Sequence, residues 1–584
     1  MGETENQRSV RFAEFVLDLS AGELHKAGRA KPIPLPEQPL QVLRELLRQP
    51  GLMVSREELI QKLWPGGGYG DFDHGLNKAV NRLRETLSDS AETPRFIETL
   101  SRRGYRFIAP VTNGSTIPVV AIAAGIASLA VLPLVNMTGD PETEYLSDGI
   151  TESIINSLSR FPNLRVIPRT SAFRYKGRQA DLKKVGRDLK VHTVLTGKLI
   201  QRGDRMVVQA ELVDVANDAQ LWGAQFSRKP EDILDVQEAV ARQICEKLRV
   251  QLTPEDDKHL AKRPTQNREA YQFLLKANYY LTKSTAEGLR QGLACARQSI
   301  DADPGCAAAY AYLSSAYTGL GLLGFLVPAE TFPRAKAAAL RALEIDDSLA
   351  EAHSVLGIVR LYYEWDWVGA EAALRRALEL NPNYAWGHAH LSDWLLIMGR
   401  YEESIAEQDL AVELDPLSPS LIFKLGQKLS YGRDYDRALE QIHKALELDP
   451  NFEWAHIFLA EVLAWTARNE ESLSACEKVA DLSGATPYTR GLRSLILGIT
   501  GKISEAKEVL NDLIKGPKPE IVALISLAET YSVLGEKDEA FKLLEAAYQQ
   551  RVSMLVFLAV MPTFGNIRTD SRYLDLLRRM GLPG

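Results

Sequence analysis

A motif that recurs at one fixed interval constrains this chain more than any other feature of its sequence. Three near-copies of Ala-Leu-Glu-Leu-Asp-Pro-Asn end in turns whose equally spaced prolines are Pro382, Pro416 and Pro450. Apolar residues at helical spacing precede each turn. A unit of this length holds two amphipathic helices and cannot bury its apolar face alone, so neighbouring units must stack on one another. The C-terminal half is therefore predicted to be an all-α solenoid.

The period and the proline-closed turn resemble the tetratricopeptide repeat. Weaker copies of the turn occur at 303–304, 346–347 and 535–540, which predicts about seven helix pairs within residues 267–560. The segment 568–582 carries charge on its outer face and is expected to cap the array, so that the whole domain covers 267–584. The concave groove of such a solenoid implies a protein or peptide partner.

Length and composition predict several globular domains. At roughly 150 residues a domain, a chain of 584 residues suggests about four. The 69 Lys and Arg against 76 Asp and Glu give a net charge of −7, which excludes a protein that is basic throughout but not a small basic module. The four cysteines lack CxxC spacing, so neither a zinc site nor a disulfide framework is expected, and the reducing cytoplasm is the simplest location.

The segment before position 112 predicts a small domain that ends in a hairpin. Ser55-Arg-Glu-Glu is a capping box that opens a helix, and Leu76, Val80 and Leu83 form one narrow apolar stripe on the next helix. The predicted elements are strands at 12–18 and 22–29, helices at 39–48, 56–63 and 74–87, and strands at 96–100 and 105–109. Three helices followed by a hairpin describe a winged helix-turn-helix.

Two motifs give this domain a family resemblance. At Leu83-Arg-Glu-Thr-Leu and Arg103-Gly-Tyr-Arg-Phe, residues 8–111 resemble the OmpR/PhoB-type DNA-binding domain. Two-component regulators place a phosphorylated receiver module before this domain. Only about ten residues precede the first strand here, so phosphotransfer to Asp is not the expected input. The order of domains instead resembles one-component regulators of the CadC/ToxR type, and dimerisation on DNA is expected from the resemblance.

One face of the third helix and the tip of the hairpin are the predicted DNA-binding surface. Opposite the apolar stripe the helix presents polar and basic side chains that suit base edges and phosphates in a major groove. Between residues 77 and 106, seven Lys and Arg oppose four Asp and Glu, although Glu85 on the same face would repel phosphate. Including positions within the two motifs, the predicted DNA-binding residues are Lys78, Asn81, Arg82, Arg84, Arg102, Arg103 and Tyr105.

Residues 129–255 predict a small α/β domain. A buried-strand run at 129–135 begins a strand–helix–strand–helix order that continues with three strands and a closing helix. The run Ala130-Val-Leu-Pro-Leu-Val-Asn and Ser147-Asp-Gly-Ile-Thr resemble the TolB-N-terminal-like or FlgO-like domain. The basic residues of 165–178 leave two interpretations open, an anion site or a solvated surface.

The segment 112–128 is predicted to be an apolar linker or a vestigial membrane segment. Residues 117–135 carry no charge and are long enough to cross a bilayer with the N-terminal domain inside the cell. However, the α/β domain needs 129–135 as a strand, and the remaining stretch, 117–128, would span only about 18 Å as a helix. A cytoplasmic protein is favoured, with a single-pass inner-membrane protein as the alternative.

The sequence supports binding rather than catalysis. It contains no HExxH, no GxSxG and no interpretable acid pair, so no enzyme activity, cofactor or metal is expected. The favoured function is a sequence-specific transcriptional regulator that binds double-stranded DNA and receives a signal or partner through its repeats. The alternative is a repeat-based scaffold or adaptor whose winged helix contacts protein.

Overall fold

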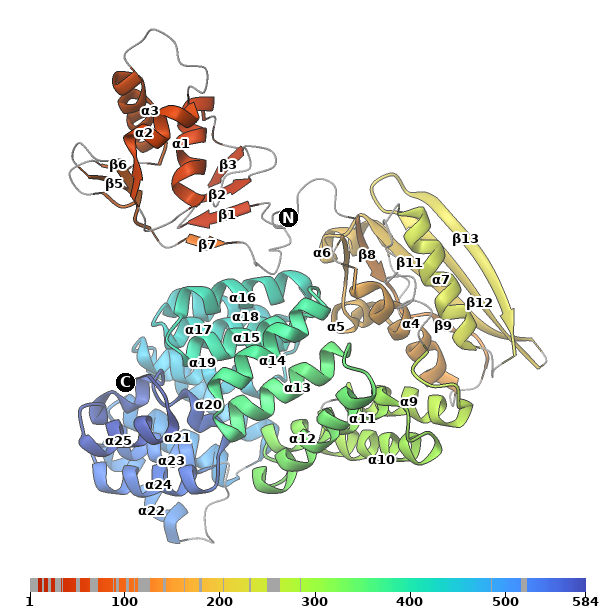
Figure 1. Cartoon of the computed structure of the whole chain (residues 1–584). Helices are drawn as coiled ribbons and strands as arrows, with labels where there is room; N and C mark the ends of the chain where they lie inside the picture. Colours follow the sequence, from red (N-terminus) through yellow and green to blue (C-terminus); the bar gives the residue numbers. More distant parts are fainter. Residues whose placement is uncertain are drawn as a thin grey trace. The chain divides into compact units, whose positions relative to one another are not determined.

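The computed structural model divides the chain into two compact units, residues 1–121 and residues 122–584. Figure 1 shows the elements of each unit in chain order. The structure describes residues 9–12, 15–18, 23–26, 33, 35–48, 53–63, 72–87, 89–90, 94–100, 104–109, 111–113, 127–139, 143–161, 163–177, 181–202, 204–229, 233–248, 263–283, 285–484, 486–515 and 523–583.

The described residues of the first unit form two antiparallel sheets and three helices around one core. The sheets have the orders β3-β2-β1-β7 and β4-β6-β5. Four phenylalanines, Phe12, Phe15, Phe96 and Phe107, pack edge-to-face or stacked at the centre of this core. The elements are β1 (Ser9–Phe12), β2 (Phe15–Asp18), β3 (Glu23–Lys26), α1 (Glu37–Arg48), β4 (Met53–Ser55), α2 (Arg56–Leu63), α3 (Phe72–Leu87), β5 (Ile97–Leu100), β6 (Gly104–Phe107) and β7 (Val111–Asn113).

The helices of this unit begin and end close to their predicted positions. The capping box is confirmed, because the Glu58 carboxylate accepts from the backbone N–H of Ser55 at 2.9 Å while the Ser55 hydroxyl accepts from the N–H of Glu58 at 3.2 Å. Both α1 and α3 start two residues earlier than expected. The predicted strand at 12–18 is instead the end of β1 and all of β2, which pair with each other as a hairpin.

The second unit begins with an α/β domain whose sheet has the order β10-β8-β11-β12-β13, with β9 also paired to β11. Helices α4 and α7 contact each other and pack on this sheet. The elements are β8 (Ala127–Val131), β9 (Val135–Asn136), α4 (Glu144–Ser159), β10 (Leu164–Val166), α5 (Arg169–Ala172), η2 (Phe173–Tyr175), α6 (Leu182–Leu189), β11 (Thr193–Arg202), β12 (Arg205–Asp214), β13 (Ala219–Arg228) and α7 (Ile233–Lys247). The predicted order of strands and helices is confirmed.

Residues 127–131 and 135–136, which include four of the seven residues of the predicted strand at 129–135, lie in this sheet, and none of 127–136 lies in a helix. The strand β8 pairs in parallel with both β10 and β11. The earlier part of the charge-free segment, 114–126, lies outside the described residues. Among the described residues, no helix combines the length and the apolar character that crossing a membrane requires.

The predicted helical solenoid is confirmed, and its described part contains eight helix pairs where about seven were expected. From α15 to α21 the pairs repeat at the interval of the prolines, because α15, α17, α19 and α21 begin at 385, 419, 453 and 487. The pairs are α9 (Arg268–Leu281) with α10 (Ala286–Ala302), α11 (Ala307–Leu322) with α12 (Pro328–Ile345), α13 (Ala350–Val359) with α14 (Trp367–Leu380), α15 (Ala385–Ile397) with α16 (Tyr401–Leu414), α17 (Pro419–Tyr431) with α18 (Tyr435–Leu448), α19 (Glu453–Trp465) with α20 (Asn469–Ser483), α21 (Pro487–Ile499) with α22 (Ile503–Lys515), and α23 (Ala523–Val533) with α24 (Lys537–Gln549).

Irregular turns and one helix close the array. The short helices η5 (Ser553–Phe557) and η6 (Pro562–Ile567) lead to α25 (Ser571–Met580), whose N-terminus is capped by Asp570. Three histidines of the repeats have local structural roles. His388 and His456 each contact the carbonyl of the turn proline that precedes their helix, and burial lowers the pKa of His390 to about 3, which keeps that ring neutral.

The α/β domain and the solenoid meet at a seam of buried and partly buried hydrogen bonds. The guanidinium of Arg165 donates to the carbonyl of Glu413 at 2.7 Å, and that of Arg174 donates to the carbonyl of Leu448 at 2.6 Å. From the solenoid, the amide of Asn383 donates to three carbonyls of the α/β domain, those of Ser159, Phe161 and Leu164. Arg165 and Arg174, predicted to face an anion or solvent, therefore join two domains instead. Neither open interpretation holds for these two residues.

Candidate nucleic-acid interface

One face of α3 is buried and the opposite face is open to solvent. Leu76, Val80 and Leu83 are at most 1% exposed, on a helix that packs against α1 and α2. Lys78 and Asn81 lie on the opposite face with exposed side chains, as does Arg82. An exposed helix with a basic and amide-bearing face has the geometry that enters a major groove.

Arg82 and Glu85 form an ion pair on this exposed face. The guanidinium of Arg82 donates to the Glu85 carboxylate at 2.8 Å, and the two side chains are 60% and 65% exposed. A pair this exposed contributes little to stability, so the Arg82 guanidinium can exchange this carboxylate for a phosphate or a base edge at small cost. Glu85, which the sequence predicts to repel phosphate, therefore also competes with DNA for the Arg82 guanidinium.

Arg84 does not lie on this face. Its side chain is 7% exposed, and its guanidinium donates to the carbonyl of Ile97 at 2.7 Å and to the hydroxyl of Thr99 at 2.8 Å. Both acceptors belong to β5, so Arg84 joins α3 to the hairpin. The prediction that Arg84 contacts DNA does not fit this burial, because reaching a duplex would break both hydrogen bonds.

Tyr105 is likewise buried, with 3% of its surface exposed. Its hydroxyl donates to the side-chain oxygen of Asn77 at 2.9 Å and accepts from the guanidinium of Arg56 at 2.9 Å. Arg56 also donates to Asn77 at 3.1 Å, so the three side chains connect α2, α3 and β6. Direct DNA contact by Tyr105 does not fit this placement. Sequence reasoning missed Arg56 and Asn77, because no local pattern signals a contact between residues so far apart in the chain.

The hairpin is anchored at both of its described ends. The Asp89 carboxylate accepts from the backbone N–H of Arg95 at 2.7 Å and of Ile97 at 2.9 Å, which fixes where β5 begins. At the start of β6, a Cβ on Gly104 would lie 2.1 Å from the carbonyl oxygen of Val54, so only glycine fits between the strands. The predicted contact residues Arg102 and Arg103 lie between these ends, outside the described residues.

The exposed basic face of α3 is suited to binding a polyanion. The exposed cations of α3 stand on a helix held by a packed core and by two side-chain links to the hairpin, so the position of the helix is fixed before binding. Within the described part of the chain, no group of three or more His, Cys, Asp and Glu is placed to hold a metal ion.

Two segments of the chain match known protein families. Residues 30–107 match the family "Transcriptional regulatory protein, C terminal", and residues 125–243 match "HilA/YgeH-like transcriptional regulator, second domain". The N-terminal unit is therefore an OmpR/PhoB-type winged helix, the DNA-binding domain of a transcriptional regulator. The more specific resemblance of the middle domain to TolB-N-terminal-like or FlgO-like domains stays a prediction.

Individual relatives cover different shares of the chain. The transcriptional regulator HilA of Salmonella typhi is 25% identical over 418 residues, 69% of this chain and 70% of that protein. "Putative adenylate cyclase 3" of Rhizobium meliloti is 35% identical over 236 residues, and the chain spans only 40% of that protein's length. Among solved structures, a tetratricopeptide-repeat protein of Thermus thermophilus is 19% identical with a TM-score of 0.29, covering 33% of this chain and 98% of that one.

Proposed function

We propose that this chain is a one-component transcriptional regulator that binds double-stranded DNA through α3 and the β5–β6 hairpin and takes its input through the repeat solenoid. The observation that carries the proposal is the exposed face of Lys78, Asn81 and Arg82 on a helix packed into the core, within a domain that matches transcriptional regulators. Arg102 and Arg103 are proposed to add contacts from the hairpin tip. Arg84 and Tyr105 are proposed to position the surface without touching DNA.

The remaining parts of the proposal concern domain organisation. We assign DNA binding to residues 8–111, a linker to 112–128, the α/β domain to 129–255 and the solenoid to 267–584. The hydrogen-bonded seam supports treating the last two as one input module. Pairing of two chains on DNA and a cytoplasmic location, where DNA is accessible, complete the proposal.

A binding function is favoured over catalysis, although one relative carries the name of an adenylate cyclase. That relative is matched over only 40% of its length, and both matched families are described as transcriptional regulators. We therefore propose that the chain itself catalyses no reaction. Incubation with ATP and magnesium, followed by assay for cyclic AMP, would contradict this if product formed.

The test measures DNA binding by the full chain at two salt concentrations. Fragments selected from the host genome should bind, and raising the salt from about 50 to about 200 mM should weaken binding about 40-fold if three phosphates are neutralised. Lys78→Gln should reduce the affinity, whereas Lys444→Gln, which removes an exposed lysine from α18, should not. If the chain binds no duplex even at low salt, the scaffold or adaptor function would replace the regulator.

A further inference from the structure

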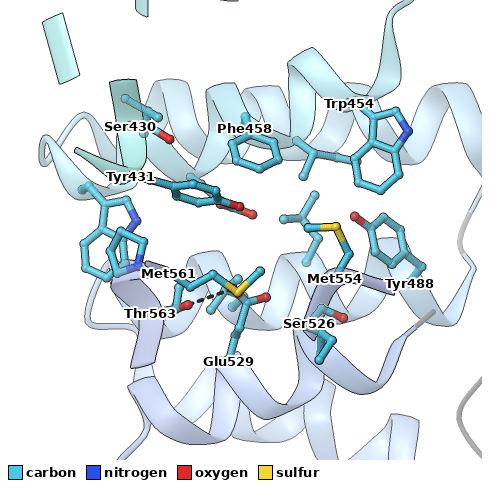
Figure 2. Close-up of a pocket in the computed structure, with 18 residues that line it drawn as sticks. Ser430, Tyr431, Trp454, Phe458, Tyr488, Ser526, Glu529, Met554, Met561 and Thr563 are labelled. Atoms are coloured by element: carbon cyan, nitrogen blue, oxygen red, sulfur yellow. Dashed lines mark hydrogen bonds between the residues drawn. The ribbon is translucent and has the colours of Figure 1, made fainter. Parts of the chain in front are cut away.

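A small cavity lies among the last repeats of the solenoid, distant in sequence from the DNA-binding surface. It has a volume of about 70 Å³ and is lined by residues of α17, α19, α21 and α23, the first helices of four successive pairs. Met554, Met561 and Thr563 from the closing turns complete its wall. Figure 2 shows the lining side chains grouped around this hollow.

Two carboxylates line the cavity from positions that correspond in the repeat. Asp393, Glu461 and Glu529 are each separated from the next by two repeat periods, so they occupy the same place on α15, α19 and α23. At Asp393 the protein supplies two cations, because Lys424 and Lys428 each donate to its carboxylate at 2.7 Å. Asp393 therefore shows what this position requires when it carries an acid.

The two cavity carboxylates lack such cations. Leu492 and Ile496 stand where Lys424 and Lys428 would be two repeats later. Within the described residues, the Glu461 carboxylate has no hydrogen bond or ion pair, and Glu529 accepts only from the Thr563 hydroxyl, at 2.8 Å. Burial and the neighbouring carboxylate raise the pKa of Glu461, while burial raises that of Glu529 to about 7. The cavity thus holds two carboxyl groups without a cationic partner among the described residues.

Aromatic rings form much of the remaining wall. Tyr431 and Phe458 lie 6.0 Å apart between ring centroids, and Trp454 and Tyr488 lie 6.2 Å apart. Figure 2 shows Glu529 directed into the hollow from the helix opposite these rings. The negative faces of aromatic rings attract cations, most strongly where water is excluded. They do not ligate metal ions, which need several oxygen ligands.

We propose that this cavity binds an alkylammonium group, which places its charge between the Glu461 and Glu529 carboxylates and its methylenes against the surrounding rings. The volume fits such a group. One water needs roughly 10–15 Å³ of such volume, so a cavity of about 70 Å³ has room for a chain of a few non-hydrogen atoms. The group is either the end of a lysine side chain from a partner peptide or a free amine. This inference deepens the proposed input role of the repeats. Any effect of the ammonium group on DNA binding rests on that proposed role, whereas its binding to the cavity does not.

The test titrates the full chain with n-butylamine and, separately, with a lysine whose backbone is blocked at both ends. Trp454 and Trp465 line the cavity and report binding by fluorescence. At pH 8 at least one of the two probes, n-butylamine or the blocked lysine, should bind at one site per chain. The neutral n-butanol, which is similar in shape, should not bind. Binding of the blocked lysine alone identifies a peptide partner, and binding of butylamine alone identifies a free amine.

The variants separate charge recognition from folding. Replacing both glutamates, Glu461→Gln with Glu529→Gln, should weaken binding at least tenfold while raising thermal stability, because it removes the repulsion between the two acids. Glu447→Gln, a glutamate of α18 outside the cavity, is the matched control and should bind as the original chain does. Equal binding by the double variant, or no binding of either cation at millimolar concentration, would overturn the inference.

Proton release provides a second readout. Because the pKa of Glu529 is raised to about 7, cation binding near pH 6.5 should expel a proton, which calorimetry in buffers of different ionisation enthalpy detects. DNA binding is measured on the same preparations. If the chain binds DNA but no ammonium compound, only the proposal for the cavity is overturned. If it binds the ammonium compound but no DNA, only the proposed regulator function is overturned.

Discussion

Two arginines of α3, two positions apart, should respond in opposite ways when DNA binding is measured. Arg82 is 60% exposed and is paired with Glu85, which is 65% exposed. Arg84 is 7% exposed and donates two hydrogen bonds to β5. We therefore expect Arg82→Gln to change the interaction with DNA, and Arg84→Met to change the stability of the domain.

The expected magnitudes follow from these surroundings. If Arg82 neutralises one phosphate, its loss should lower the slope of log K against log salt by about 0.9, and if it reads a base the affinity should fall by about 1–3 kcal/mol. Arg84→Met removes two hydrogen bonds from a charged donor, each worth about 1.5–3 kcal/mol, but also removes the cost of burying that charge. A net loss of about 2–4 kcal/mol in the free energy of unfolding, with an unchanged salt slope, is expected.

Fluorescence anisotropy with a labelled duplex between about 50 and about 200 mM salt measures the slope, and urea unfolding measures the stability of each variant. The titrations are best done at low temperature, so that the Arg84→Met domain stays folded. If Arg84→Met lowers the salt slope as much as Arg82→Gln while unfolding normally, Arg84 contacts DNA and its burial has been misinterpreted.

Three further predictions concern other charges. Glu85→Gln should strengthen DNA binding by up to about 1 kcal/mol, seen in the same anisotropy assay, because it frees Arg82 and removes a repelling charge; weaker binding would contradict this. Burial raises the pKa of Asp415 from 3.8 to about 6, so its ionisation should cost the folded chain about 3 kcal/mol as the pH rises from 4 to 7, and urea unfolding of Asp415→Asn should lack that loss. Asp393→Asn leaves the fully buried ammonium of Lys428 without a counter-charge and should cost about 3–5 kcal/mol of unfolding free energy; a variant as stable as the original chain would show that the ion pair is dispensable.

Features with a local period were predictable from the sequence. The equal spacing of Pro382, Pro416 and Pro450 places the helices that follow them correctly, because every repeat must present its apolar face to the next. The capping box at Ser55 and the apolar stripe of α3 were also predictable, since each depends on residues at most a few turns apart. The order of strands and helices in the α/β domain followed from the same kind of periodicity.

Charged side chains inside the fold were not predictable in this way. Arg84 follows Leu83 on the helix and looks from sequence like one more surface cation, yet its acceptors belong to a strand that begins 13 residues later. Tyr105 belongs to a motif that carries the family resemblance, which suggested DNA contact although Tyr105 itself is buried and bonded to Asn77 and Arg56. A motif indicates that its residues serve a common role. Only the distances between their atoms show whether the side chains face a ligand or bind one another.

The seam was invisible for a related reason. Arg165 and Arg174 find most of their acceptors among backbone carbonyls, several of them in the solenoid, and every residue type offers a carbonyl. No side-chain pattern in the repeats therefore signals the partner. The sequence shows the basic residues of 165–178, but the solenoid carbonyls that accept from Arg165 and Arg174 lie more than 240 residues later and could not be inferred from it.

One helix connects this seam with the cavity of the last repeats. The turn before α17 accepts from Arg174 through the carbonyl of Leu417, and the backbone N–H of Leu417 donates to the Ser171 hydroxyl at 2.8 Å. The other end of α17 carries Ser430 and Tyr431, which line the cavity. A helix of 13 residues is about 20 Å long and nearly rigid. Because one rigid helix contributes to both places, any occupant of the cavity that shifts the backbone of α17 would also displace the seam hydrogen bonds of Leu417.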